Sequence, residues 1–168
     1  MSAKCIYYVE GSCEQQLVAA LKQEPAKLIP GKVRLFNVIQ KRIPKSHLIS
    51  IVPGTTVVFV FDTDKPEIDI LNYNIAVFSK HNIRVKMVLL MQVMNIEDEL
   101  VRATDVRAAP ELTKSRSVSN FKTDFCKLAP MECRRLLERH HIDADKLWSA
   151  PAPAPFDCYA RNDAVARN

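Results

Sequence analysis

Three acidic residues stand where an oxygen-liganded metal ion could bind. Asp62 and Asp64 follow a continuously apolar segment, 55–61, and Glu10 follows a second apolar segment, 5–9. In an extended chain, residues two apart point to the same side, so the carboxylates of Asp62 and Asp64 can meet at one cation. Carboxylate and water ligands suit Mg²⁺ or Mn²⁺. Without a metal, acids so close together would repel, and at least one would keep its proton.

The same acids also have simpler interpretations. Asp62 and Asp64 would fit a surface turn that Pro66 punctuates. Glu10 and Glu14 would fit the start of a helix, where a negative charge favours the helix dipole. A second acid at the end of another expected strand favours the metal site over the turn.

A further acidic stretch, 95–99, follows the last expected strand. Glu97 or Glu99 could join the acid cluster from there. As the first turn of a helix, the stretch would carry the same acids because of the helix dipole. Both interpretations are open at this point.

Apolar segments and helix patterns alternate along the first two thirds of the chain. Segments that suit buried strands lie at 5–9, 32–39, 55–61 and 85–94, and helix patterns lie at 13–22, 45–52, 67–81 and 95–104. This order predicts an α/β fold: an open, mainly parallel four-stranded sheet with helices on both faces. Ligands bind such a sheet at the carboxyl ends of its strands, where Glu10 and Asp62 are expected.

The last third of the chain has a different composition. Residues 111–128 are rich in Ser, Lys and Thr. A helix is expected at 130–139 and a stiff extended tract at 151–155. We therefore predict an α/β core over residues 1–108 and a helical or extended appendage, packed on the core, over residues 109–168.

The amino-acid composition excludes several classes of protein. The chain has 168 residues, of which 48% are hydrophobic and 26% charged, so one domain can bury a core. Only three glycines are present, and no Walker-type or dinucleotide fingerprint occurs. Five cysteines without a C-x-x-C pair disfavour a disulfide framework and a structural zinc site. Because we find no signal-peptide pattern and no stretch of membrane-span length, we expect a cytoplasmic protein without a membrane partner.

The net charge of +5 is unevenly distributed. Residues 1–60 contain eight Lys or Arg against three Asp or Glu, residues 61–105 five against eight, and residues 106–168 eleven against eight. This pattern is expected if a carboxylate site lies inside a basic surface, and chance clustering on a solvated face would also produce it. Nucleic acid is the expected partner, and a homodimer or a larger assembly is open. The candidate phosphate-binding residues are Lys65, Lys114, Arg116 and Lys122.

Two motifs resemble the TOPRIM domain over residues 4–105. They are Glu10-Gly11 after the first strand, and Asp62-Thr63-Asp64 after the Val-Val-Phe-Val-Phe strand. TOPRIM domains occur in topoisomerases, bacterial primases, recombination proteins of the RecR type and OLD-family nucleases. The stretch Val9-Glu10-Gly11-Ser12-Cys13-Glu14 looks most like the V-E-G-x-x-E of small RloB-like proteins, which are associated with phage defence.

The resemblance implies a role for each acid. In that family the first Glu is the general acid/base and the two Asp residues bind a divalent metal. By position, Glu10 takes the first role and contributes to the metal site, while Asp62 and Asp64 hold Mg²⁺ or Mn²⁺. Glu14 and Glu97 are further candidates for the metal site. The chain departs from some members in lacking glycines around its two Asp residues.

These residues fit three functions. The favoured one is a Mg²⁺-dependent phosphodiester-processing enzyme, a nuclease acting on DNA or RNA, for which the resemblance suggests phage defence. The alternative is a non-catalytic TOPRIM-like module that binds nucleic acid or protein. A phosphatase-like enzyme of the haloacid-dehalogenase type is less favoured. In that fold the Asp-x-Asp motif follows the first strand and carries a Thr where Pro66 stands here.

Overall fold

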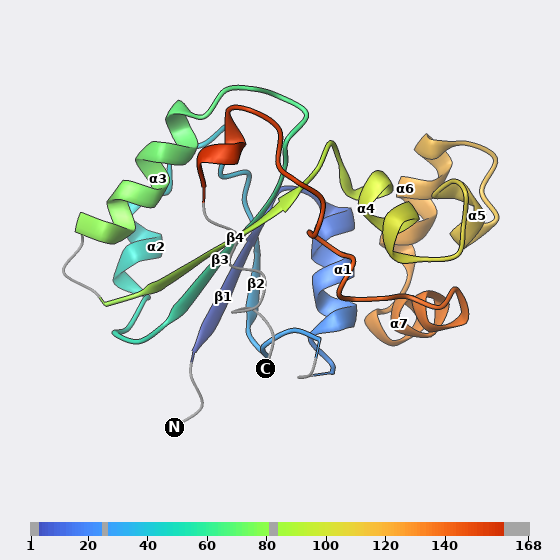
Figure 1. Ribbon diagram of the computed structural model, residues 1–168. Helices are drawn as coiled ribbons and strands as arrows, with labels where there is room; N and C mark the ends of the chain where they lie inside the picture. Colours follow the sequence, from blue (N-terminus) through green and yellow to red (C-terminus); the bar gives the residue numbers. More distant parts are fainter. Residues whose placement is uncertain (1–3, 25–26, 81–83, 160–168) are drawn as a thin grey trace.

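One parallel sheet forms the centre of the protein. The computed structural model describes residues 4–24, 27–80 and 84–159. Its strands, in the spatial order β2-β1-β3-β4, are β1 (Cys5–Val9), β2 (Lys32–Leu35), β3 (Thr56–Asp62) and β4 (Lys86–Gln92) (Figure 1). All neighbouring strands pair in parallel, which confirms the predicted α/β open sheet.

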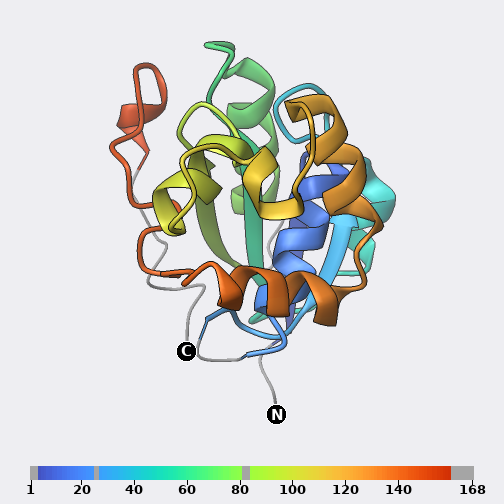
Figure 2. The same ribbon diagram turned by 90° about the vertical axis from the view of Figure 1, so that its right-hand side faces the viewer.

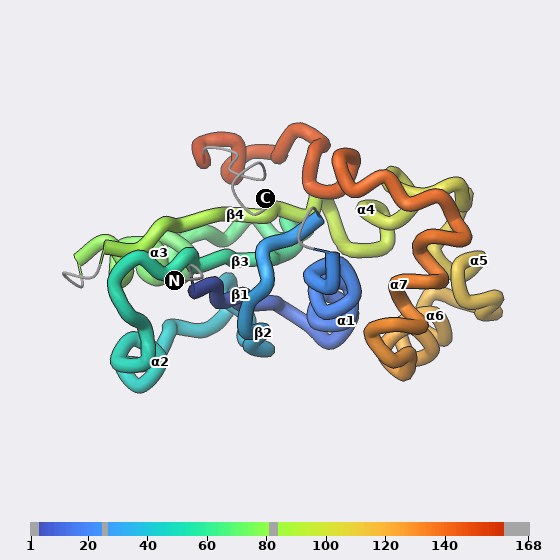
Figure 3. Tube along the Cα trace, turned by 90° about the horizontal axis from the view of Figure 1, so that it is seen from below, coloured from blue at the N-terminus to red at the C-terminus, as the bar shows by residue number. Residues whose placement is uncertain are grey.

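Helices cover both faces of the sheet (Figures 1 and 3). On one face lie α1 (Ser12–Leu21), α4 (Ile96–Ala103), α5 (Pro110–Thr113), α6 (Val118–Lys127) and α7 (Pro130–Arg139). On the other face lie α2 (Lys45–Ile49), α3 (Asp69–Lys80) and the 3-10 turn η1 (Phe156–Cys158). Successive side chains of a strand point to opposite faces of the sheet, so the hydrophobic core has one part on each face. Val58 and Val60 face α1, whereas Val57 and Phe59 face α3.

The pairing of β1 with β3 sets the edge at which the acids lie. Val9 is opposite Val60, and the backbone amide of Glu10 donates to the Val60 carbonyl at 3.2 Å. β3 runs two residues further than β1 and ends at Asp62, which is opposite Gln92 of β4. The first residue after β1 and the last residue of β3 are therefore neighbours.

The second strand is shorter than the expected segment 32–39 and ends at Leu35. The side-chain oxygen of Asn37 accepts hydrogen bonds from the amides of Ile39 and Gln40, both at 3.0 Å. This local turn takes the chain out of the sheet, because Asn side chains compete well for nearby backbone donors.

Two helices that the sequence pattern did not locate lie within residues 110–127. This stretch holds α5 and α6, and α6 is capped by the Ser117 hydroxyl, which accepts from the Asn120 amide at 3.1 Å. Phe121 and Phe125, four residues apart on α6, are fully buried. The polar composition hid the helix, because this spacing of two aromatic rings is its main apolar signal.

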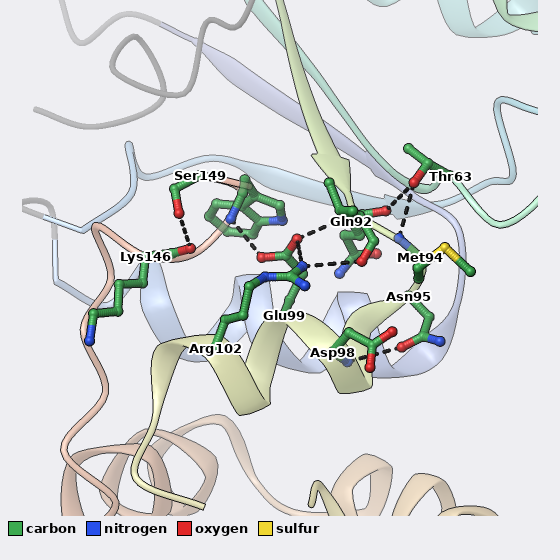
Figure 4. Close-up of polar contacts among 11 residues, drawn as sticks. Thr63, Gln92, Met94, Asn95, Asp98, Glu99, Arg102, Lys146 and Ser149 are labelled. Carbon is green, nitrogen blue, oxygen red and sulfur yellow. Dashed lines mark hydrogen bonds and ion pairs between the residues drawn. The ribbon is translucent and has the colours of Figure 1, made fainter. Parts of the chain in front are cut away.

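The buried carboxylate of Glu99 links the segment around Trp148 to the carboxyl edge of the sheet (Figure 4). Glu99 of α4 is fully buried and accepts from the amides of Val93 at 3.0 Å and Trp148 at 2.8 Å. It also pairs with Arg102 one turn later. Trp148 has a φ of 56°, a left-handed conformation that costs free energy in a residue with a side chain. The bond to Glu99 offsets this cost.

The helices after residue 108 pack mainly on α1, through α6 and α7. Their side chains share one hydrophobic cluster with β1, β3 and β4. The division at residue 108 stays a prediction. Among the described residues, no helix combines the length and the apolar character needed to cross a membrane.

We expect Phe121→Ala to lower the free energy of unfolding by about 3–5 kcal/mol, because it empties a fully buried site between α6 and α1. The matched control is Val118→Ala on the same helix, whose side chain is half exposed; it should change stability by less than about 1 kcal/mol. Urea unfolding followed by circular dichroism measures both. Equal effects of the two substitutions would contradict the packing of α6 described here.

Candidate functional site

A cavity of about 450 Å³ lies at the carboxyl ends of β1 and β3, between the start of α1 and α6. Figure 2 shows α6 running beside the upper end of α1. The residues that line the cavity and carry titratable side chains are Glu10, Cys13, Glu14, Asp62, Lys122 and Cys126. The cavity thus collects three of the predicted acids and one of the predicted phosphate-binding residues.

Glu10 is held in place by two hydrogen bonds. Its Oε2 accepts from the backbone amide of Asp62 at 3.0 Å, and its Oε1 accepts from the side-chain amide of Asn37 at 2.8 Å. The carboxylate of Glu10 therefore bridges the ends of β1 and β3 and the turn after β2. The role of Asn37 could not be inferred from its sequence position, because it depends on where the turn brings its side chain.

Gly11 makes room for the carboxylate of Glu14. A Cβ atom on Gly11 would lie 2.7 Å from Oε2 of Glu14. Gly11 is the N-cap of α1, and Glu14 sits in the first turn with only 5% of its surface exposed. Burial, together with the negative charges of Glu10 and Glu97, raises the pKa of Glu14, while the backbone amides of Gly11 and Glu14 partly offset this rise.

Asp62 has the most perturbed carboxyl group of the cavity. Burial raises its pKa to about 9, and the negative charges of Glu14, Glu10, Asp64 and Glu97 add to the effect. Its Oδ1 is buried and has no hydrogen-bond partner among the described residues. Without a cation, Asp62 is therefore protonated at neutral pH, as expected for one member of such a cluster.

Of the two α4 acids that the sequence indicates as candidates, Glu97 and Glu99, only Glu97 belongs to the site. Its Oε1 lies 2.9 Å from the Nζ of Lys122, and this contact raises the pKa of Lys122. Glu97 is nearly buried, whereas about half of the Lys122 side chain is exposed, 55%. Glu99 points away and performs the structural role described above. The Glu97–Lys122 pair could not be expected from the sequence, since α6 itself was missed.

Asp64 lies outside the cavity lining and is exposed, as is Lys65 after it. The intervening Thr63 is buried and ties the chain to β4 (Figure 4). Its hydroxyl donates to the Gln92 carbonyl at 3.0 Å and accepts from the Met94 amide at 3.1 Å. From the rim of the site, the negative charge of Asp64 therefore helps to raise the pKa of Asp62. Lys114 and Arg116 are also exposed, before α6.

Gln92 is a polar residue of this edge that the sequence did not single out. It is fully buried and stands opposite Asp62 in the sheet. Alternation with Val88 and Leu90 places its side chain on the α1 face, the same face as Asp62. Neither polar atom of its side-chain amide has a hydrogen-bond partner among the described residues. Buried side-chain amides normally have hydrogen-bond partners, so Gln92 is a further polar candidate at this edge.

The acids surround the cavity rather than meet at one point. Within the part of the chain that the structure describes, no three His, Cys, Asp or Glu side chains form a ready-made metal site. Glu10, Glu14 and Asp62 nevertheless share the cavity, and the charges of Asp64 and Glu97 reach Asp62. A cation in the cavity would need carboxylate ligands from β3, from the β1–α1 junction, or from both.

Comparison of the chain with protein-family models, with curated proteins and with solved structures gives no match. The resemblance to TOPRIM domains therefore remains an expectation from two short motifs. The function has to be inferred from the residues of the cavity.

We expect the stability of the metal-free protein to fall as the pH rises from about 4 to about 9. Across this range folded Asp62 keeps a proton that the unfolded chain releases, because its pKa is raised from 3.8 to about 9. Asp62→Asn removes this dependence. Its stability relative to wild type should therefore increase between pH 4 and pH 8 by several kcal/mol, on the order of 5.

Urea unfolding in the presence of a chelator, at several pH values, measures this difference. The matched control is Asp98→Asn, which removes an exposed carboxylate one residue after Glu97. Its stability curve should run parallel to that of wild type. A curve for Asp62→Asn that is equally parallel would show that Asp62 titrates normally.

Proposed function

We propose that this protein is a Mg²⁺- or Mn²⁺-dependent phosphodiester-processing enzyme, a nuclease acting on DNA or RNA, with a TOPRIM-like core. The observation that carries the proposal is the carboxyl group of Asp62, which is buried among acids with one oxygen unpartnered within the described residues. Such an arrangement destabilises the folded protein unless a cation balances it. The resemblance to RloB-like proteins adds phage defence as the context, and the five free thiols agree with a cytoplasmic protein.

The donor set fits a hard divalent cation. Asp62, Glu10 and Glu14 offer carboxylate oxygens. The side chain of Gln92, which has no hydrogen-bond partner within the described part of the chain, lies next to Asp62 in the sheet. A cavity of about 450 Å³ has room for an ion with part of its water shell. Burial raises the pKa of the Cys13 thiol and keeps it neutral, so the sulfur is a poor competitor as ligand. Asp62 with Glu10 and Glu14 would hold the ion, and Asp64 would add charge from the rim.

The residues around this position supply the other parts of a phosphodiester reaction. A bound Mg²⁺ or Mn²⁺ would polarise a phosphoryl oxygen and stabilise the leaving oxygen. Glu10, oriented by Asn37 and by the Asp62 amide, is placed to move a proton. Lys122 reaches the cavity with a half-exposed ammonium group that Glu97 orients, and is placed to bind a phosphate of the substrate.

We expect the wild-type protein to bind Mn²⁺, and Asp62→Asn to weaken this binding at least tenfold, since the central carboxylate is lost. Glu10→Gln should weaken the binding less than Asp62→Asn does and should lower cleavage of DNA or RNA about 100-fold or more, because it removes the group that moves the proton. Asp98→Asn is the control for the loss of one nearby negative charge. Titration of the Mn²⁺ electron paramagnetic resonance signal and gel assays with labelled single- and double-stranded DNA and RNA measure both.

The outcomes separate the proposed enzyme from the alternative. Mn²⁺ binding without cleavage of any of these substrates would favour the non-catalytic binding module. Failure to bind Mn²⁺, or cleavage that survives Asp62→Asn, would contradict the proposed site.

We expect the exposed basic residues before α6 to contact the nucleic acid backbone. Replacing both Lys114 and Arg116 by Gln should weaken binding of single-stranded DNA at low salt and reduce the slope of log K against log salt by about 1 to 2. The control replaces Lys41 and Lys45, which are exposed at α2 on the other side of the sheet. Fluorescence anisotropy over a salt series measures the slopes. Equal effects of the two double substitutions would mean that only net charge matters.

A further inference from the structure

Two cysteines from distant parts of the chain meet in the wall of the cavity. The Sγ atoms of Cys13 on α1 and Cys126 on α6 lie 3.1 Å apart, although 113 positions separate them in sequence. Both residues line the cavity. A disulfide bond has an S–S length of about 2.0 Å, so a movement of about 1 Å would bring the two sulfurs to bonding distance.

We propose that Cys13 and Cys126 form an oxidation site, at which a hydroperoxide closes a reversible disulfide between α1 and α6. The other three cysteines lie in different settings. Cys5 and Cys133 are buried in the apolar core, and Cys158 is exposed on η1 at the other face of the sheet. Among the described residues, the pair Cys13–Cys126 is the one with sulfur atoms in direct contact.

Access from solvent decides which sulfur reacts first. Cys126 is half-buried at the cavity wall, whereas Cys13 has only 7% of its surface exposed. The Sγ of Cys13 also lies 3.7 Å from the Lys122 carbonyl, so it is enclosed by α6 on one side. An oxidant that enters the cavity therefore meets Cys126, and Cys13 is positioned to resolve the product.

The chemistry balances with a hydroperoxide as the oxidant. The Cys126 sulfur attacks the peroxide, takes up one oxygen as a sulfenic acid, and releases an alcohol, or water when the oxidant is hydrogen peroxide. The neutral Cys13 thiol then attacks the Cys126 sulfur and gives its proton to the sulfenic hydroxyl group in the same step, so that the S–S bond forms and the hydroxyl group leaves as water. In total the two thiols lose two electrons and two protons, and the peroxide is reduced.

The bond would join the two elements that frame the site. α1 carries Glu14 directly after Cys13, and α6 carries Lys122 one turn before Cys126. Oxidation would therefore fix the distance between the acidic side of the cavity and the Lys122–Glu97 pair. The inference concerns the thiols themselves and holds whether or not the protein cleaves nucleic acid.

The test treats the whole protein with a few equivalents of hydrogen peroxide, blocks the remaining thiols with iodoacetamide, and maps the peptides by mass spectrometry. Trypsin places Cys126 in peptide 123–127 and Cys133 in peptide 128–134, and cleavage after Glu10 separates Cys5 from Cys13. We expect a Cys13–Cys126 cross-link that dithiothreitol reverses. The oxidised protein should melt at least about 5 °C higher than the reduced one, because the bond closes a long loop.

Variants make the assignment specific. Cys13→Ser and Cys126→Ser should abolish both the cross-link and the shift in melting temperature, while Cys133→Ser and Cys158→Ser should keep both. The wild-type map alone is decisive if a variant fails to fold. A cross-link between Cys126 and Cys133, a cross-link between molecules through Cys158, or oxidation without any disulfide would overturn the proposal.

Discussion

The hydrogen bond from the Asp62 amide to the Glu10 carboxylate is the contact on which the site depends. It exists because β1 and β3 pair in parallel, with Val9 opposite Val60, so that both strands present their carboxyl ends at one edge. The bond fixes the Glu10 side chain against the end of β3. Glu14, Glu97 and Lys122 then gather around these two residues from the helices that cover one face. A shift in the β1–β3 register would separate all of them.

Much of this arrangement follows from short-range patterns. The β-branched segment before Asp62 can only be buried on both faces, and that favours a central parallel strand. Once two such strands are parallel, Glu10 and Asp62 both lie at the carboxyl edge of the sheet. That they are neighbours depends on the pairing of β1 with β3, which the sequence does not show. The expected protonation of one acid follows as well, since crowded carboxylates in a buried setting cannot all ionise.

What the sequence did not reveal depends on contacts across long separations. α6 was missed because two aromatic residues in a polar stretch are only a weak helix pattern. The helix is stabilised by its packing on α1, a contact that the sequence does not show. The Glu97–Lys122 pair and the Cys13–Cys126 contact could not be foreseen without that helix. Asp64 was expected beside Asp62, but the two hydrogen bonds of the Thr63 hydroxyl hold the intervening chain against β4, and Asp64 lies exposed at the rim.

The crowding of acids at this edge has a consequence for the order in which ligands would bind. A cavity that holds Glu10 and Glu14 beside Asp62 repels the phosphates of a polyanion as long as no cation balances it. For the function proposed here, the metal ion and the nucleic acid would then be thermodynamically linked partners. Each would tighten the binding of the other by the same factor. In this way, the electrostatic repulsion in the metal-free cavity would make the binding of the metal ion and of the nucleic acid cooperative.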